Sequence, residues 1–86
     1  MQLTRDEILK QGFVDFRVTA RGMIQNHKFV VKREKSPFGE IPFLVVNAVV
    51  QVHELSRVAE ALQLPIRSGS AVAFPKGKMA KDFAGL

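Results

Sequence analysis

Apolar and polar residues alternate from residue 14 to residue 21, which is the pattern of a strand with one face in solvent. A second strand is predicted for residues 28–34, and Asn26 and His27 can form a turn between the two runs. Gly22, at the end of the first run, indicates a bulge or bend. We therefore expect an antiparallel hairpin whose turn lies at Asn26 and His27.

The longest apolar run of the chain covers residues 41–52 and follows a turn signal at Pro37 and Gly39. Its apolar residues do not alternate with polar ones, so a strand here should be covered on both faces. The helices of the protein can cover one face. The rest of the chain, a second subunit or a ligand must cover the other.

The N-terminal segment carries the signals of a short helix. Thr4 and Glu7 have the spacing of a capping box, in which each side chain accepts a hydrogen bond from a backbone N–H at the start of a helix. Gly12 can adopt the left-handed conformation that ends a helix. These residues predict a helix from Arg5 to Gln11.

A second helix is predicted where apolar residues recur at positions i, i+3, i+4 and i+7, namely Leu55, Val58, Ala59 and Leu62. Glu54, Arg57 and Glu60 fall on the opposite side and are expected to face water, with a weak pair between Glu54 and Arg57. Pro65 ends this helix. After a turn of serine and glycine, residues 71–74 are expected to form a last short strand.

Together these elements predict an α+β fold in the order α-β-β-β-α-β. We expect a three-stranded antiparallel sheet, a short fourth strand and two helices on one face of the sheet. In a chain of 86 residues, we expect residues 1–75 to form a single globular domain. Residues 76–86 are expected to form a basic, mobile C-terminal tail.

The composition is that of a globular protein, with 47% hydrophobic and 24% charged residues. The chain has no cysteine, which excludes disulfides and thiolate metal ligands and agrees with a reducing cytoplasm. The polar, acidic N-terminus shows no secretory signal, and no apolar run approaches the ~20 residues of a bilayer span. We expect a cytoplasmic protein without membrane contact.

The net charge of +5 is concentrated in two segments of the chain. Residues 13–35 carry six basic and two acidic side chains, and residues 65–86 carry four basic and one acidic. Residues 36–64, in contrast, carry one basic and three acidic side chains. A basic hairpin and a basic tail are typical of proteins that bind a polyanion.

Nucleic acid is the first partner that this charge distribution indicates. The chain has no tyrosine or tryptophan, and most of its phenylalanines fit core positions, so phosphate contacts are favoured over base stacking. The candidate nucleic-acid-binding residues are Arg17, Arg21, Lys28, Lys32, Arg33, Lys35, Lys76 and Lys78.

A protein partner is the alternative, either an acidic protein surface or a second copy of this chain. The apolar run 41–52 is long for a chain of this size to cover, and exposed apolar surface favours association. The candidate interaction residues are Phe43, Val45, Asn47 and Val49.

No catalytic or metal-binding arrangement can be named from the sequence. His27 and His53 are far apart and lack the spacing of metal ligands. The serines have no paired base, and no glycine-rich segment has the strand–loop–helix context of a phosphate loop. We therefore expect a small non-enzymatic binding or regulatory module without a cofactor or metal.

The order helix, three strands, helix resembles that of a double-stranded-RNA-binding domain. The basic start that such domains show on their second helix is absent, because this position reads His53-Glu54-Leu55-Ser56-Arg57. Residues 55–62 are also similar to the first helix of a helix-turn-helix. The following segment, residues 66–74, contains Gly69 and is a poor recognition helix. Neither resemblance assigns the chain to a family.

Overall fold

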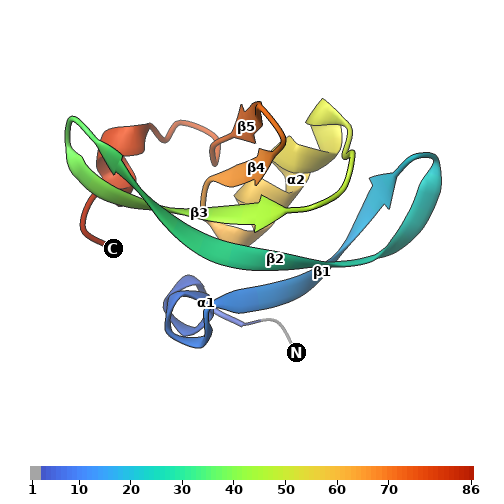
Figure 1. Cartoon of the computed structure of the whole chain (residues 1–86), viewed down its shortest axis with the longest axis horizontal. Helices are drawn as coiled ribbons and strands as arrows, with labels where there is room; N and C mark the ends of the chain where they lie inside the picture. Colours follow the sequence, from blue (N-terminus) through green and yellow to red (C-terminus); the bar gives the residue numbers. More distant parts are fainter. Residues whose placement is uncertain (1–2) are drawn as a thin grey trace.

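The computed structural model describes residues 3–86, in which five strands form one mixed sheet in the order β1-β2-β3-β4-β5 (Figure 1). The strands are β1 (Phe13–Ala20), β2 (Met23–Ser36), β3 (Gly39–Val46), β4 (Ile66–Ser68) and β5 (Ala71–Ala73). The helices are α1 (Arg5–Gln11), α2 (Val52–Leu62) and the short 3-10 helix η1 (Ala80–Phe83). The predicted α+β class is confirmed.

The sheet differs in detail from the predicted one. The first three strands are antiparallel neighbours, as expected, but β4 is an additional strand that pairs parallel to β3. β4 and β5 then form a short antiparallel hairpin, so the C-terminal part contributes two strands instead of one. The predicted last strand at residues 71–74 is therefore confirmed as β5, and only β4 was not recognised, since three residues before a turn carry little pattern. The segment compared above with a recognition helix is this hairpin.

The predicted turn at Asn26 and His27 is wrong, because both residues lie within β2. The chain reverses at Arg21 and Gly22, whose φ angles are 52° and 76°, and Ala20 pairs with Met23 on either side of them. Two successive positive φ angles are the mark of the type I′ turn, whose twist matches that of the flanking strands. Glycine supplies one of the two positions without strain.

The predicted strand over residues 41–52 is shorter than expected. β3 ends at Val46, residues 47–51 form a loop, and α2 begins at Val52. Val49 is 64% exposed and Val52 is 69% exposed. The apolar run therefore extends beyond the strand into solvent, which residue type alone cannot show. Val50 forms an isolated antiparallel β-bridge with Ala20, on the edge of β1 that faces away from β2.

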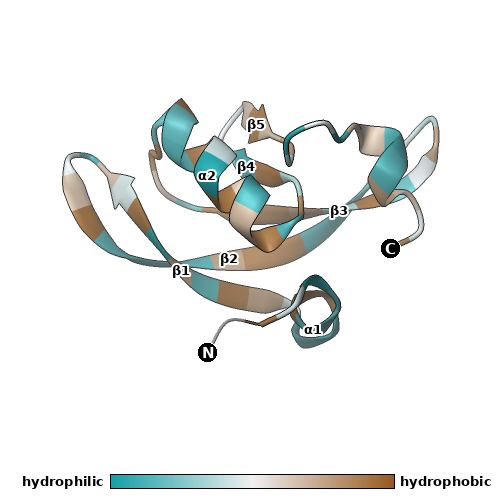
Figure 2. Ribbon diagram, turned by 180° about the vertical axis from the view of Figure 1, so that it is seen from behind, coloured by the Kyte–Doolittle hydropathy of each residue, from teal (hydrophilic) through white to brown (hydrophobic). Residues whose placement is uncertain are grey.

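The helices pack on the sheet with a shared core. The capping box of α1 is present as predicted, and Ile8 of this helix is fully buried. The apolar stripe of α2 is buried in the same core, and the start of α1 lies near Gln63 at the end of α2. Figure 2 shows the side on which α2 crosses the strands. No helix of residues 3–86 lies on the face of the sheet turned away from α2 (Figure 1).

The C-terminal segment lies beside β3 where the short strand β4 does not reach. The ring of Phe83 is buried and stacks on the ring of Phe74, with 6.3 Å between the ring centres. The ring of Phe74 also makes an edge contact with that of Phe43, again with 6.3 Å between the ring centres. The N–H of Gly85 donates to the carbonyl oxygen of Glu40 at 2.9 Å. This segment therefore supplies part of the cover that β3 needs. The mobility expected for residues 76–86 stays a prediction.

Across residues 3–86, none of the helices has the length and apolar character needed to span a bilayer.

Candidate nucleic-acid interface

The side-chain alternation of β1 assigns its residues to two faces of the sheet. Phe16 and Val18 point toward α2, because the guanidinium of Arg57 lies 5.5 Å from the Phe16 ring centre and Val18 is fully buried. Arg17, between them, must point to the opposite face. This second face, which no helix covers, is called the open face here.

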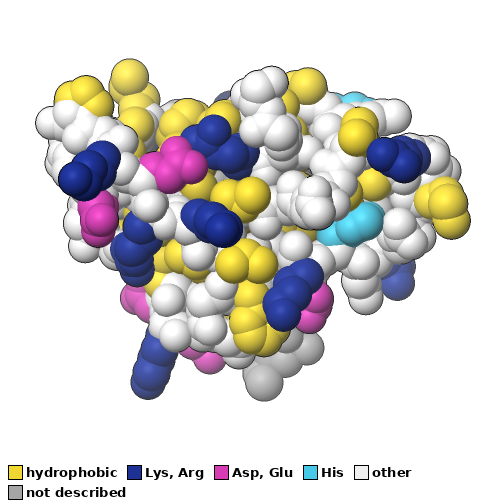
Figure 3. Space-filling view, viewed as in Figure 1, with side chains coloured by type: hydrophobic (Ala, Val, Ile, Leu, Met, Phe, Trp, Pro, Cys, Tyr) yellow, Lys and Arg dark blue, Asp and Glu magenta, His cyan; other side chains and the backbone are white. Residues whose placement is uncertain are grey.

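The register of the sheet places further basic residues on the open face. Arg17 is paired with Asn26, and Lys28 and Lys32 lie two and six residues further along β2, so all three cations share this face. The pairs Val30 with Val45 and Val45 with Arg67 bring Arg67 to the same face. Figure 3 shows basic side chains interspersed with hydrophobic ones over this face.

Two of these cations cover aromatic rings. The Nζ atom of Lys28 lies 4.6 Å from the ring centre of Phe13, and the guanidinium of Arg67 lies 4.7 Å from that of Phe43. Such contacts are favourable because a cation is attracted to the negative face of the ring. They also occupy the ring faces that a nucleobase would need for stacking. The open face therefore offers positive charge, and little aromatic surface, to a ligand.

The acidic residues leave the open face with a positive excess. Asp15 is paired in register with Lys28, and Glu34 forms an ion pair with Arg67 at 2.5 Å. Among residues 3–86, neither Arg17 nor Lys32 has a carboxylate within ion-pair distance. Arg17 and Lys32 are thus the cations most available to an external anion.

The remaining predicted residues lie elsewhere. Arg21 is in the β1–β2 turn. Arg33 and Lys35 are odd-numbered residues of β2 and so lie on the face opposite to the open face. Arg33 also donates a hydrogen bond to the carbonyl oxygen of Leu86. Lys76 lies beside α2, where its backbone N–H donates to the Glu60 carboxylate at 2.7 Å. Lys78 closes the turn that follows, with its backbone N–H bonded to the carbonyl oxygen of Pro75. The eight predicted residues therefore do not form one site. Arg67 was missed because its strand was not recognised.

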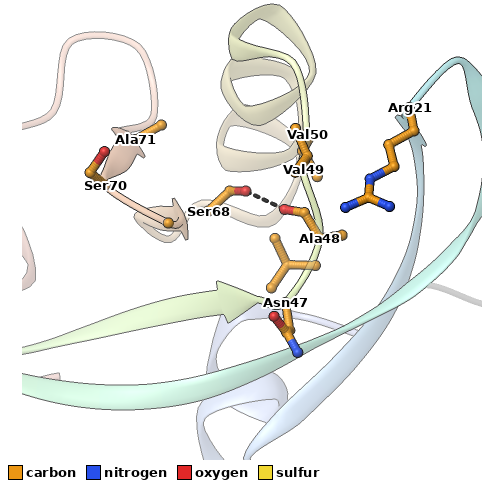
Figure 4. Close-up of a pocket in the computed structure, with 10 residues that line it drawn as sticks. Arg21, Asn47, Ala48, Val49, Val50, Ser68, Ser70 and Ala71 are labelled. Carbon is orange, nitrogen blue, oxygen red and sulfur yellow. Dashed lines mark hydrogen bonds between the residues drawn. The ribbon is translucent and has the colours of Figure 1, made fainter.

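The candidate interaction residues are likewise divided. Phe43 and Val45 are on the open face, and Phe43 is nearly buried there. Asn47 and Val49 belong to the loop after β3, which is flanked by a pocket of about 490 Å³ on one side and one of about 400 Å³ on the other. Figure 4 shows the Arg21 guanidinium directed toward this loop. The loop is anchored by the Ser68 hydroxyl, which donates to the Ala48 carbonyl oxygen at 2.5 Å.

The outer edge of β1 is capped by two side chains of α2. Glu54 accepts a hydrogen bond from the N–H of Thr19 at 2.8 Å, and Arg57 donates to the carbonyl oxygen of Arg17 at 2.6 Å. The expectation that Glu54 faces water is wrong, since only 9% of the residue is exposed. The hydrogen bond from Arg57 and that from Thr19 lower the pKa of Glu54 to about 2. This contact holds β1, and with it Arg17, in place.

Within residues 3–86 there is no group of three or more histidine, aspartate or glutamate side chains that could hold a metal ion. Comparisons of the chain with protein-family models, with curated proteins and with solved structures gave no significant match.

Proposed function

We propose that this protein is a small binding module that contacts nucleic-acid phosphates through the open face of its sheet. The observation that carries the proposal is the common orientation of Arg17, Lys28 and Lys32 on a sheet face without a covering helix. Phosphate contacts require several cations on one accessible surface. Strands hold the backbone of these residues at fixed spacing, so the charges are presented together.

The expected mode is recognition of the phosphate backbone and its shape. The rings of Phe13 and Phe43 lie under Lys28 and Arg67, so base stacking on this face would require these contacts to be broken. Phosphate contacts position a protein on nucleic acid and carry little sequence information. We therefore propose binding that depends on salt and only weakly on sequence.

The proposal is for a non-enzymatic, cytoplasmic module. It is supported by the lack of cysteine and of a recognisable group of acid, base and nucleophile in the sequence. The alternative, a homodimer or protein-interaction module built on residues 41–52, stays a prediction. Its candidate residues are shared between the open face and the loop after β3.

The test compares two triple variants of equal charge. In the open-face variant, glutamine replaces Arg17, Lys28 and Lys32. In the control variant, glutamine replaces Lys35, Lys76 and Lys78. Binding to a fluorescent duplex RNA, a duplex DNA and a single-stranded RNA is measured by anisotropy at several salt concentrations. With about three phosphate contacts, the wild type should show a log–log salt slope of about −3 on duplex DNA.

The open-face variant should lose at least about tenfold in affinity at low salt and show a shallower slope, because it has lost the contacts that release counterions. The control should keep the wild-type slope. Equal losses in the two variants would show that net charge alone attracts the nucleic acid, and the proposal would then be abandoned.

A further inference from the structure

The N-terminal half of β2 has a free edge on the side away from β1. β2 contains 14 residues, but β1 pairs with residues 23–30 and β3 pairs with residues 30–36. β3 ends at Val46 and the chain then turns away into the loop that leads to α2. No strand of residues 3–86 therefore pairs with residues 24–28 along the line that β3 would follow past Val46.

The hydrogen-bond pattern identifies which backbone groups point to this line. The backbone N–H of Thr19 and the backbone carbonyl of Arg17 form hydrogen bonds with side chains of α2, so the backbone groups of these odd-numbered residues point away from β2. The backbone groups of the even-numbered residues of β1 therefore form the hydrogen bonds to β2. Their partners on β2 are odd-numbered. The N–H and C=O groups of Ile24, Asn26 and Lys28 hence point outward. Within residues 3–86, no hydrogen bond to these backbone groups is formed on that side.

The other long edge of the sheet is treated differently. At β1, Glu54, Arg57 and the bridge from Val50 occupy the outward backbone groups between Arg17 and Ala20. Unpaired edges are sites where a further strand can be added, and proteins commonly protect them. The contrast between the capped edge of β1 and the open edge of β2 singles out the latter.

A pocket of about 400 Å³ lies beside this edge, on the side of the sheet that carries α2. It is formed by the hairpin residues Ala20, Arg21, Met23, Gln25 and His27 and by the loop residues Asn47, Ala48 and Val49. An added strand would direct alternate side chains into this pocket and toward the open face. The exposed side chains of Met23 and Val49, at 62% and 64%, can contact apolar residues of that strand.

Charge decides between the two extended ligands that this edge could take. Lys28 lies on the edge and Arg21 lines the pocket, while the pocket lining contains no acidic residue. A second copy of the chain would bring another net charge of +5 to this edge. An acidic peptide would instead meet complementary charge.

We propose that residues 24–28 of β2 bind an extended acidic peptide as an additional strand of the sheet. The peptide's backbone pairs with Ile24, Asn26 and Lys28, its carboxylates face Lys28, and its apolar side chains enter the pocket beneath. Strand addition of this kind obtains affinity from main-chain hydrogen bonds and specificity from pockets for alternate side chains. The inference rests on the edge geometry and does not require nucleic-acid binding, although both proposals use Lys28.

The test uses a capped six-residue peptide of alternating glutamate and valine as the probe. Amide hydrogen exchange of the free protein should be fast at Ile24, Asn26 and Lys28 and slow at Gln25 and His27. Saturating peptide should slow exchange of the first group about tenfold or more, because their N–H groups become bonded. The same peptide with alternate amides methylated, and a peptide of alternating lysine and valine, serve as controls.

The matched variants are Asn26→Pro and Asn26→Thr. Proline at position 26 removes an N–H that points away from β1, so the β1–β2 ladder should tolerate it while strand addition is blocked. Threonine keeps the N–H. Binding of the acidic peptide should fall about tenfold or more in the proline variant and change less than about threefold in the threonine variant, in line with the loss of one or two hydrogen bonds.

Three outcomes would overturn the proposal. In the first, the methylated peptide binds as well as the unmodified one. In the second, both variants bind equally. In the third, protection of Asn26 rises with protein concentration in the absence of peptide, which would identify a second copy of the chain as the occupant of the edge.

Discussion

The carboxylate of Glu54, in α2, accepts a hydrogen bond from the backbone N–H of Thr19, in β1, at 2.8 Å. Arg57 completes the contact, since it donates to both Glu54 oxygens at 3.1 Å and to the Arg17 carbonyl oxygen at 2.6 Å. Two side chains of a helix thus take the positions that a neighbouring strand would occupy. The contact joins residues 35 positions apart in the sequence and fixes α2 against the edge of β1.

Stability should fall at acidic pH through Glu54. Its pKa is lowered from 4.5 to about 2, so the folded protein binds this proton less readily than the unfolded chain. The contribution of Glu54 is therefore complete above about pH 5 and is lost as the pH falls toward 2. Because Arg57 is half exposed, we expect Glu54 to contribute on the order of 1–2 kcal/mol to the free energy of unfolding. This contribution is smaller than the pKa difference alone would give.

Urea unfolding of the wild type and of Glu54→Gln between pH 2 and pH 7 measures this contribution. The difference in free energy of unfolding should be largest near neutral pH and shrink as the pH falls. Glu7 also has a lowered pKa, owing to the backbone and side chain of Thr4, but it is present in both proteins and cancels in the difference. A difference that does not vary with pH would contradict the prediction.

Removal of the cap should make the edge of β1 available for association. We expect Glu54→Ala/Arg57→Ala to lose about 2 kcal/mol of stability and to self-associate, because the backbone groups of Arg17 and Thr19 become unpaired. The control is Arg5→Ala/Asp6→Ala, which removes an exposed ion pair of the same net charge and should cost less than about 0.5 kcal/mol. Light scattering coupled to size exclusion reports the association. A monomeric double variant would show that this edge needs no cap.

The β1–β2 turn should be improved by a residue that prefers positive φ. Arg21, at φ 52°, is a non-glycine residue in the left-handed region, where asparagine is more favourable. Arg21→Asn should therefore stabilise the protein by about 0.5 kcal/mol. Gly22→Ala should destabilise it by about 1 kcal/mol through backbone strain alone, because no heavy atom of residues 3–86 beyond the two chain neighbours lies within 4 Å of the added Cβ. Urea midpoints check both values, and a stabilising Gly22→Ala would contradict the turn assignment.

The docking of the C-terminal segment can be measured with two phenylalanines. Phe83 is 2% exposed and stacks on Phe74, whereas Phe38 is 58% exposed in the β2–β3 turn. Phe83→Ala should cost about 3 kcal/mol because a buried ring is replaced by a cavity. Phe38→Ala should cost less than about 0.5 kcal/mol. Similar losses from the two substitutions would indicate that the segment is mobile, as the sequence led us to expect.

The predictions made from the sequence succeeded where the signal was local. Thr4, Glu7 and Gly12 define α1 because capping groups lie within a few residues of the backbone groups that they satisfy. The candidate residues Arg17, Lys28 and Lys32 lie on one face of the sheet, although the turn between their strands was misplaced. The misplaced turn changes which residues of the two strands are paired. It shifts the pairing by an even number of residues, so the same side chains of the second strand share a face with Arg17.

Other features required the folded chain. The sequence of residues 41–52 looks uniform, but Val46 is buried in a strand and Val49 is 64% exposed in a loop. Glu54 occupies a polar position of an amphipathic helix, which predicts exposure, yet the edge of β1 lies against it. Arg67 joins the open face only because β4 pairs in parallel with β3. In each case the partner is a distant segment.

The sequence by itself thus determined the α+β class, the bounds of α1, the apolar stripe of α2 and the basic character of one side of the first hairpin. These follow from periodicities of 3.6 and 2.0 residues and from capping, which act within a few neighbouring residues. The tertiary structure alone decided where β3 stops, which edge of the sheet Glu54 and Arg57 cap, and which edge stays open at Asn26. These depend on contacts between segments far apart in the chain, whose energies no local pattern of residues contains.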